Sequence, residues 1–205
     1  MMLGSLNNQS GVAQKILMET VKLASSDIVS NSEDERALVE AARCDPAAFS
    51  RLYHRYVSRV YRYLYKLAEN QIEAEDLTSQ VFTEAMEGLA HYQERGNFTA
   101  WLFTIARRKA IAARRHQRPT LQLDDVDELP GPAEDPLQQL IQSEQIEQMA
   151  TLFARLNDDQ RELLRLRFTA GLSFADIGAI LGRSQAATKM AVYRLLHKMN
   201  KNWKE

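Results

Sequence analysis

The chain has 205 residues, a formal net charge of −1 and 45% hydrophobic residues, enough for one large or two small packed domains. Its lone cysteine, Cys44, excludes an internal disulfide and argues against a cysteine-based zinc site. The four histidines are scattered without metal-ligand spacing, and no nucleophile or acid–base cluster is recognisable. No apolar run reaches membrane-spanning length and no signal peptide is evident. We therefore expect a cytoplasmic, non-enzymatic protein with no catalytic residues, cofactor, metal or membrane contact of its own.

An all-α first domain is predicted over residues 32–118, after a flexible N-terminal extension over 1–31 that could instead be a partner-binding helix. Ser32 and Glu35 follow the capping-box pattern. Asp45 and Pro46 then start a second helix, as N-cap and first helical residue. Apolar residues at helical spacing continue that helix and predict a third from about Gln71 to Leu89 with an acidic outer face.

The segment Arg95–Arg118 closes this domain with a strongly polarised helix. Its first half is apolar and aromatic, whereas its second half is almost wholly basic, and the segment contains no acidic residue. Trp101, Leu102 and Ile105 fall on one stripe, which favours a place in the core for Trp101. A helix anchored at one end and cationic along the other suits phosphate binding.

Composition changes abruptly at Pro119. The stretch from Pro119 to Pro136 holds four prolines and six acidic residues but no cation. Such a segment has too few large apolar groups for a core and is extended by proline and by charge repulsion. We therefore predict an acidic, Pro-rich linker over 119–137 between two small helical domains.

A second all-α domain is predicted over 138–205. Asn157 or Asp158 caps one helix, which Gly171 ends. Ser173 then opens a short helix that Gly182 breaks before a long, basic last helix begins near Ser184. This order is the helix-turn-helix pattern, whose second helix reads the major groove. The residues expected in its core are Ile177, Ile180, Leu181, Ala187, Ala191, Val192 and Leu195.

The basic last helix and the acidic face of the third helix each have an alternative interpretation in which the charge serves no binding function. The last helix could belong to an ordinary helical hairpin with a solvated charged face, and the acidic face of the third helix could simply be solvated. Spacing alone favours DNA binding for the helix-turn-helix, whereas the acidic face gains a role only from a wider family context.

The two halves together resemble the bacterial sigma factors of the extracytoplasmic-function (ECF) group. AEDLTSQVFTEAM resembles that family's polymerase-binding motif, and WLFTIARRKA resembles its helix for the minus-ten promoter element. LNDDQRELLRLRF and LSFADIGAILGRSQAATKMAVYRLL resemble its minus-thirty-five-binding domain. The chain departs from the usual residues of that family at four places. Ser79-Gln80 replaces Gln-Glu, Arg108 replaces Asn, and Ala112 stands where a polar residue is common. Thr188 replaces Val, for which it is an expected near-isostere.

The resemblance implies a factor that binds core RNA polymerase, opens promoter DNA and directs transcription initiation, with an anti-sigma factor as an open further partner. The implied polymerase contacts are Asp76, Gln80 and Glu84. The implied minus-ten contacts are Tyr92, Asn97, Phe98, Arg107, Arg108, Lys109, Ala112, Arg114, Arg115 and Arg118. Tyr92, Asn97 and Phe98 are the candidates for holding a base taken out of the stack, and the cations would bind phosphates. The implied minus-thirty-five contacts are Arg183, Ser184, Gln185, Lys189, Met190, Tyr193 and Arg194.

Two other functions remain open from the residues alone. A stand-alone helix-turn-helix regulator would bind duplex DNA without polymerase, at two-fold symmetric half-sites. An interaction protein would bind polymerase or sigma antagonists without selecting promoters. The acidic linker likewise has two interpretations, a segment that occupies the polymerase's nucleic-acid channels or a solubilising spacer.

Overall fold

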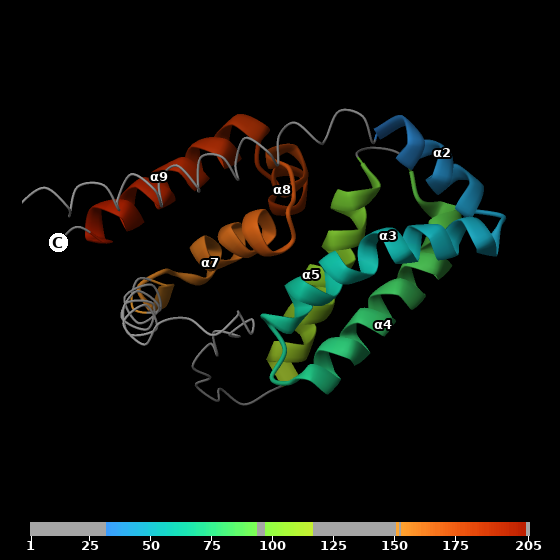
Figure 1. Cartoon of the computed structure of the whole chain (residues 1–205), viewed down its shortest axis with the longest axis horizontal. Helices are drawn as coiled ribbons and strands as arrows, with labels where there is room; N and C mark the ends of the chain where they lie inside the picture. The colour runs from blue at the N-terminus through green and yellow to red at the C-terminus, as the bar shows by residue number, and fades with distance from the viewer. Residues whose placement is uncertain (1–31, 94–96, 117–150, 152, 204–205) are drawn as a thin grey trace, which may run out of the picture. The chain divides into compact units, whose positions relative to one another are not determined.

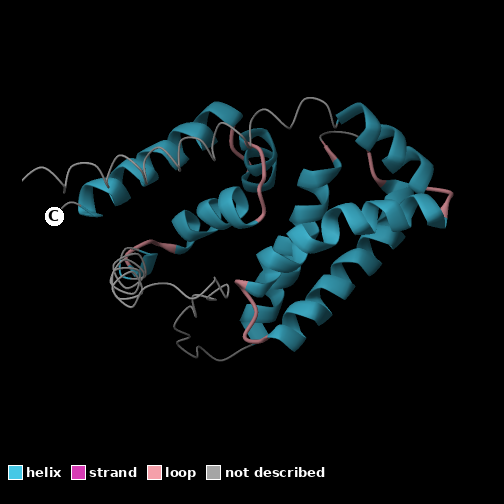
Figure 2. Cartoon of the chain, in the orientation of Figure 1, coloured by secondary structure: helices cyan, strands magenta, loops and turns pink. Residues whose placement is uncertain are grey.

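The computed structural model describes residues 32–93, 97–116, 151 and 153–203. Every regular element among these residues is helical (Figures 1 and 2), which confirms the all-α prediction. The N-terminal extension, the acidic linker and the domain boundaries predicted at 118 and 138 lie outside the described residues. Packing divides the chain into two units, Met1–His54 and Arg55–Glu205.

The first unit contains α2 (Ser32–Ala42) and the start of α3 (Pro46–Tyr65). The predicted restart of the chain is confirmed, because Asp45 Oδ1 accepts the Ala47 N–H at 2.9 Å. Pro46 occupies the first helical position, where its missing N–H costs nothing. The buried side chains of this unit are Val39, Ala42, Ala48 and Leu52.

The second unit begins with the remainder of α3, α4 (Gln71–Gly88), the short 3-10 helix η1 (Leu89–His91) and α5 (Phe98–His116). Asn70 caps α4 by accepting the Glu73 N–H at 2.9 Å, and α4 and α5 pack on each other. Two tyrosines of α3, Tyr56 and Tyr63, are buried in this core. Tyr56 bonds Thr99 through its hydroxyl at 3.0 Å, and Tyr63 packs edge-on against Phe103.

The same unit ends with α7 (Asp158–Leu164), the π-helical turn η2 (Arg165–Thr169), α8 (Phe174–Leu181) and α9 (Gln185–Trp203). Local sequence signals place most of these boundaries correctly. Asn157 forms a capping box with Gln160, and Ser173 forms one with Asp176. The π-helical turn was not expected, since the sequence predicts one uninterrupted α-helix through Phe168.

The helix-turn-helix of α8 and α9 depends on two glycines (Figure 1). Gly182 ends α8 with φ 66°, a left-handed conformation that favours glycine. A Cβ atom on Gly178 would lie 2.6 Å from the Arg183 carbonyl oxygen, so the turn can fold back this closely only without a side chain there.

The expected core of the helix-turn-helix is confirmed only in part. Ile177, Val192 and Leu195 are buried as predicted, while Ile180, Leu181 and Ala191 are only partly buried. Ala187 is exposed, and Thr188 is fully buried in its place. The Thr188 hydroxyl donates to the Ser184 carbonyl at 3.0 Å. Burial of a hydroxyl is tolerable because it is hydrogen-bonded, so Thr188 fills the site of an apolar residue.

Candidate nucleic-acid interface

The basic half of α5 lies at the surface, as the sequence predicts. Leu102, Phe103, Ala106 and Ala110 are buried along one side of the helix. On the other side, Arg108, Ala112, Arg114 and Arg115 are exposed, while Arg107 and Lys109 are half-buried. Arg118, the last of the predicted phosphate contacts, lies outside the described residues. This surface can hold the phosphates of a nucleic-acid strand.

An aromatic cluster of Tyr92, Phe98 and Trp101 lies at the start of α5. Tyr92 and Phe98 are buried, with 7% and 3% of their surface exposed, whereas Trp101 is only partly buried. The Trp101 ring lies 5.0 Å from Tyr92 and 5.5 Å from Phe98. Trp101 therefore lies only partly in the core that was predicted for it. The role of Tyr92 and Phe98 in holding a flipped base stays a prediction, and both side chains are buried in this structure, where they fold inward beneath the start of α5.

Asn97 remains exposed at the beginning of α5. Its Oδ1 atom accepts the Ala100 N–H at 2.9 Å, so it caps the helix, and its Nδ2 atom donates to the Asp176 carboxylate. Arg107 similarly forms an ion pair with Glu162 at 3.5 Å. Two of the predicted minus-ten residues thus have acidic partners in α7 and α8. The sequence gives no signal for these contacts between distant segments.

The three predicted polymerase contacts on α4 do not share one environment. Asp76 and Gln80 are exposed and hydrogen-bond each other at 2.7 Å, one turn apart. Glu84 instead faces α5, where its carboxylate pairs with Arg108 and with Lys109, the latter at 3.2 Å. Only Asp76 and Gln80 therefore remain on an open face of α4.

The outward face of the helix-turn-helix largely follows the prediction. Exposed residues at the turn and along α9 are Arg183, Ser184, Gln185, Lys189, Met190 and Arg194. Ser184 also caps α9, since its hydroxyl oxygen accepts the Ala187 N–H at 3.2 Å. Tyr193 is only partly exposed because its ring lies 6.3 Å from that of Phe174. A helix with this exposed set fits the major groove, where Lys and Arg read guanine and Gln reads adenine.

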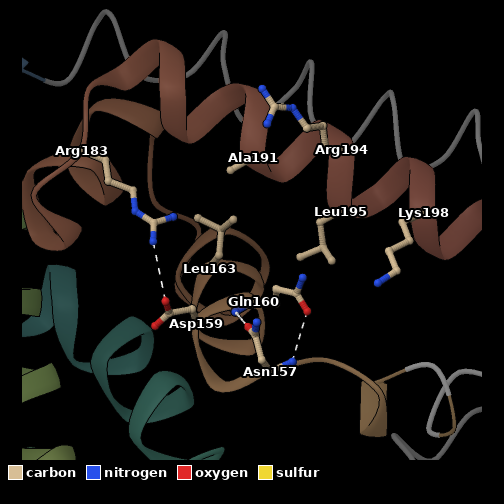
Figure 3. A pocket seen from close by; sticks show the side chains of 9 residues that line it. All are labelled: Asn157, Asp159, Gln160, Leu163, Arg183, Ala191, Arg194, Leu195 and Lys198. Carbon is tan, nitrogen blue, oxygen red and sulfur yellow. Dashed lines mark hydrogen bonds and ion pairs between the residues drawn. The ribbon is translucent and has the colours of Figure 1, made fainter.

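A cavity of about 330 Å³ lies between α7 and α9. Figure 3 shows Leu163 and Leu195 between the two helices, with Arg183, Arg194 and Lys198 around them. Arg183 also reaches Asp159, at 3.8 Å. The cavity combines an apolar centre with a basic rim, and two of its cations belong to the predicted DNA-binding set.

Neither a metal centre nor a membrane span is found in the described part of the chain. There, no group of three or more His, Cys, Asp or Glu side chains is placed to hold a metal ion. None of the described helices combines the length and apolar character needed to cross a membrane.

Comparisons with known proteins identify the family. The model for Sigma-70 region 2 matches residues 52–120, and the model for Sigma-70, region 4 matches residues 152–201. The ECF RNA polymerase sigma factor BldN of Streptomyces coelicolor is 36% identical over 80% of this chain and 64% of its own length. The RNA polymerase sigma factor CarQ of Myxococcus xanthus is 30% identical over 74% of this chain and 87% of its own length. The chain belongs to the ECF group of sigma-70 family sigma factors.

The sigma factor spans slightly less than two thirds of BldN. Its fold is also that of solved sigma factors. The structure of CnrH in complex with the cytosolic domain of CnrY has a TM-score of 0.59, with 20% identity, covering 83% of this chain and 97% of that one. RpoE from Bartonella quintana, solved with the anti-sigma factor NepR, has a TM-score of 0.56 and 20% identity. The match covers 76% of this chain and 96% of that one.

The two family matches contain the two candidate DNA-binding surfaces of this sigma factor, which are the basic half of α5 and the exposed face of α9. The region 2 match contains all of α4 and α5, and the region 4 match contains α7, α8 and most of α9. The resemblance inferred from sequence motifs is therefore confirmed. Sequence reasoning missed the ion pairs of Glu84 with Arg108 and Lys109, because only the crossing of α4 and α5 brings Glu84 beside the basic helix.

Proposed function

We propose that this sigma factor binds core RNA polymerase and directs it to promoters, where it recognises two DNA elements and starts DNA opening. The observation that carries the proposal is the coincidence of each family match with a surface of the right chemistry. The region 2 match contains the exposed cations of α5, and the region 4 match contains the helix-turn-helix. The protein then acts as a specificity factor in the cytoplasm, where polymerase and DNA are found.

Polymerase binding is assigned to the open face of α4. Asp76 and Gln80 lie exposed on this helix and hold each other in place through a 2.7 Å hydrogen bond. Ile72 and Met86, also on α4, are 78% and 58% exposed. Apolar side chains next to carboxylates on one helix suit a partner surface that is itself apolar with basic groups around it.

Minus-ten binding is assigned to α5 and the residue before it. Arg108, Lys109, Arg114 and Arg115 would contact phosphates, which fixes the strand without reading its sequence. Asn97 is the remaining exposed candidate for base contact, while the buried Tyr92 and Phe98 support the helix start from inside. The partly exposed Trp101 ring adds an aromatic surface beside Asn97 on which a base could stack.

Minus-thirty-five binding is assigned to the start of α9. Gln185, Lys189 and Arg194 are exposed along it and have side chains that can reach base edges in the major groove. Arg183 and Ser184 stand at the turn, where backbone phosphates would pass. A single reading helix gives modest affinity, so the two DNA contacts and the polymerase have to act together.

The decisive test is run-off transcription with purified core polymerase and a library of genomic promoter fragments. The proposal predicts transcripts with fixed starts only when both core and the sigma factor are present, and weak DNA binding by the sigma factor alone. Tight binding to duplex DNA without polymerase would instead indicate a stand-alone regulator. Polymerase binding without any transcript would indicate an interaction protein.

An anti-sigma factor is part of the proposal as a further partner, since similar sigma factors have been solved with one.

A further inference from the structure

Glu84 connects the two functional helices of the region 2 domain. It projects from α4 toward α5, and its two carboxylate oxygens divide between adjacent cations, Oε1 to Arg108 and Oε2 to Lys109. The Glu84 and Lys109 side chains are 31% and 29% exposed, whereas Arg108 is 65% exposed. One acidic residue thus holds two of the cations that α5 would offer to DNA.

This arrangement is built by the packing of α4 on α5. Ala85, next to Glu84, is fully buried, and Ala110, next to Lys109, is 3% exposed. Glu84 and Lys109 therefore stand at the edge of the packed faces, where the two helices are held together. The long Arg and Lys side chains lose rotational freedom in such a pairing, so their charged groups are placed before any DNA arrives.

The pairing also changes the charge that α5 presents. Without Glu84, Arg108 and Lys109 would form a doubly positive site; with it, the net charge of the three groups is +1. Ion pairs at this degree of exposure are weak, so a correctly placed phosphate can displace the carboxylate. A phosphate in another position gains less binding free energy, because it must compete with the Glu84 carboxylate for the two cations.

We propose that Glu84 is a positioning residue for promoter DNA: it orients Arg108 and Lys109 and lowers their attraction for phosphates that are not in register. The inference rests on the proposed function, since it requires DNA on α5. It also separates Glu84 from Asp76 and Gln80, which keep the role of polymerase contacts.

The test compares holoenzymes made with wild-type, Glu84→Gln and Glu87→Gln sigma factors. Glu87 is an exposed acid one turn further along the same helix, and the ion pairs of Arg108 and Lys109 are made with Glu84 instead, so its variant removes the same charge without breaking the pair. Binding of a mixed-sequence 20-nucleotide single strand is measured by fluorescence anisotropy over a range of salt concentrations. Glu84→Gln should raise this affinity about two- to fivefold and steepen the log–log salt dependence by about 0.7 for each cation released. Glu87→Gln should change neither the affinity nor its salt dependence.

Two further measurements decide the mechanism. Glu84→Gln should have no additional effect on salt dependence when Arg108 and Lys109 are both changed to Gln, because the groups it holds are then absent. Affinity for core polymerase, measured by competition with labelled wild-type sigma factor, should be unchanged.

Loss of core affinity in Glu84→Gln would overturn the inference and return Glu84 to the polymerase contacts. A lower melting temperature with an unaltered salt dependence would also overturn it, as the pair would then be merely structural. Failure of the proposed function is distinguishable, since it would appear in the wild-type protein as an absence of specific transcripts.

Discussion

The guanidinium of Arg167 lies 4.4 Å from the centre of the Phe174 ring and donates a 2.6 Å hydrogen bond from Nη1 to the Leu172 carbonyl. Arg167 is only 4% exposed, and this burial lowers the pKa of its guanidinium from the ordinary value. A buried cation is tolerated when hydrogen bonds and an aromatic face compensate for lost water. Arg167 thereby ties the π-helical turn to the loop that leads into α8.

Replacing Arg167 with Met should therefore destabilise the region 4 domain. The change leaves the buried Leu172 carbonyl without this donor and removes the cation–ring contact, at a cost of about 2–3 kcal/mol in the free energy of unfolding. Urea denaturation followed by circular dichroism measures the loss. Arg167→Lys retains the charge but not the planar group, and should recover only part of the stability. Equal stability of wild type and Arg167→Met would contradict this role.

The two glycines of the helix-turn-helix should respond differently to substitution. At Gly178, even the Cβ of Ala would meet the Arg183 carbonyl oxygen at 2.6 Å, which predicts a loss of about 1–3 kcal/mol from overpacking. At Gly182 nothing lies within 4 Å of the added atom, and only the positive φ is unfavourable. Asn tolerates that conformation, so Gly182→Asn should be well tolerated while Gly178→Asn is not. Thermal unfolding of the four Ala and Asn variants checks the contrast.

Base recognition by α9 can be tested at Lys189, which is exposed and lies 5.9 Å from the centre of the Tyr193 ring. If Lys189 contacts a base, Lys189→Ala should weaken minus-thirty-five recognition by about 1–3 kcal/mol and relax the preference at one base pair. Run-off transcription across a set of single-base promoter variants provides the measurement. A uniform loss at every variant would instead assign Lys189 to a phosphate.

Stability at high pH should depend on Tyr63. Burial, followed by the charge of Glu162 and a 2.6 Å hydrogen bond to it, raises the pKa of the Tyr63 phenol well above its ordinary value of 10.0. Because the pKa is raised only in the folded state, the contribution of the Tyr63 phenol to the free energy of unfolding is complete below about pH 10. This contribution is lost as the pH rises further. Between pH 8 and 11 the wild type should lose about 1 kcal/mol more stability than Tyr63→Phe, which has no phenol to ionise.

Chemical denaturation of both proteins at each pH gives that difference directly. Groups other than Tyr63 also titrate in this range, but they are common to the two proteins and cancel in the comparison. Parallel losses in wild type and Tyr63→Phe would show that the phenol is not held by its surroundings.

Local chemistry in the sequence determined the helices and most of their ends. Asp45 before Pro46, Asn157 three residues before Gln160, and Gly182 after an apolar helix each mark a boundary, because caps are satisfied by atoms only a few residues apart. The segregation of charge along α5 and the helix-turn-helix pattern were likewise readable in one dimension, as was the family they indicate.

The tertiary structure alone decided how these helices meet. Whether Trp101 or Tyr92 is buried, and whether Glu84 faces a partner or the neighbouring helix, depends on where α4 crosses α5. Helical periodicity assigns a residue to a face but does not say what lies against that face, since the crossing is set by side-chain packing between segments distant in sequence. The same packing brings Arg167 over Phe174, and no spacing rule in the sequence predicts it.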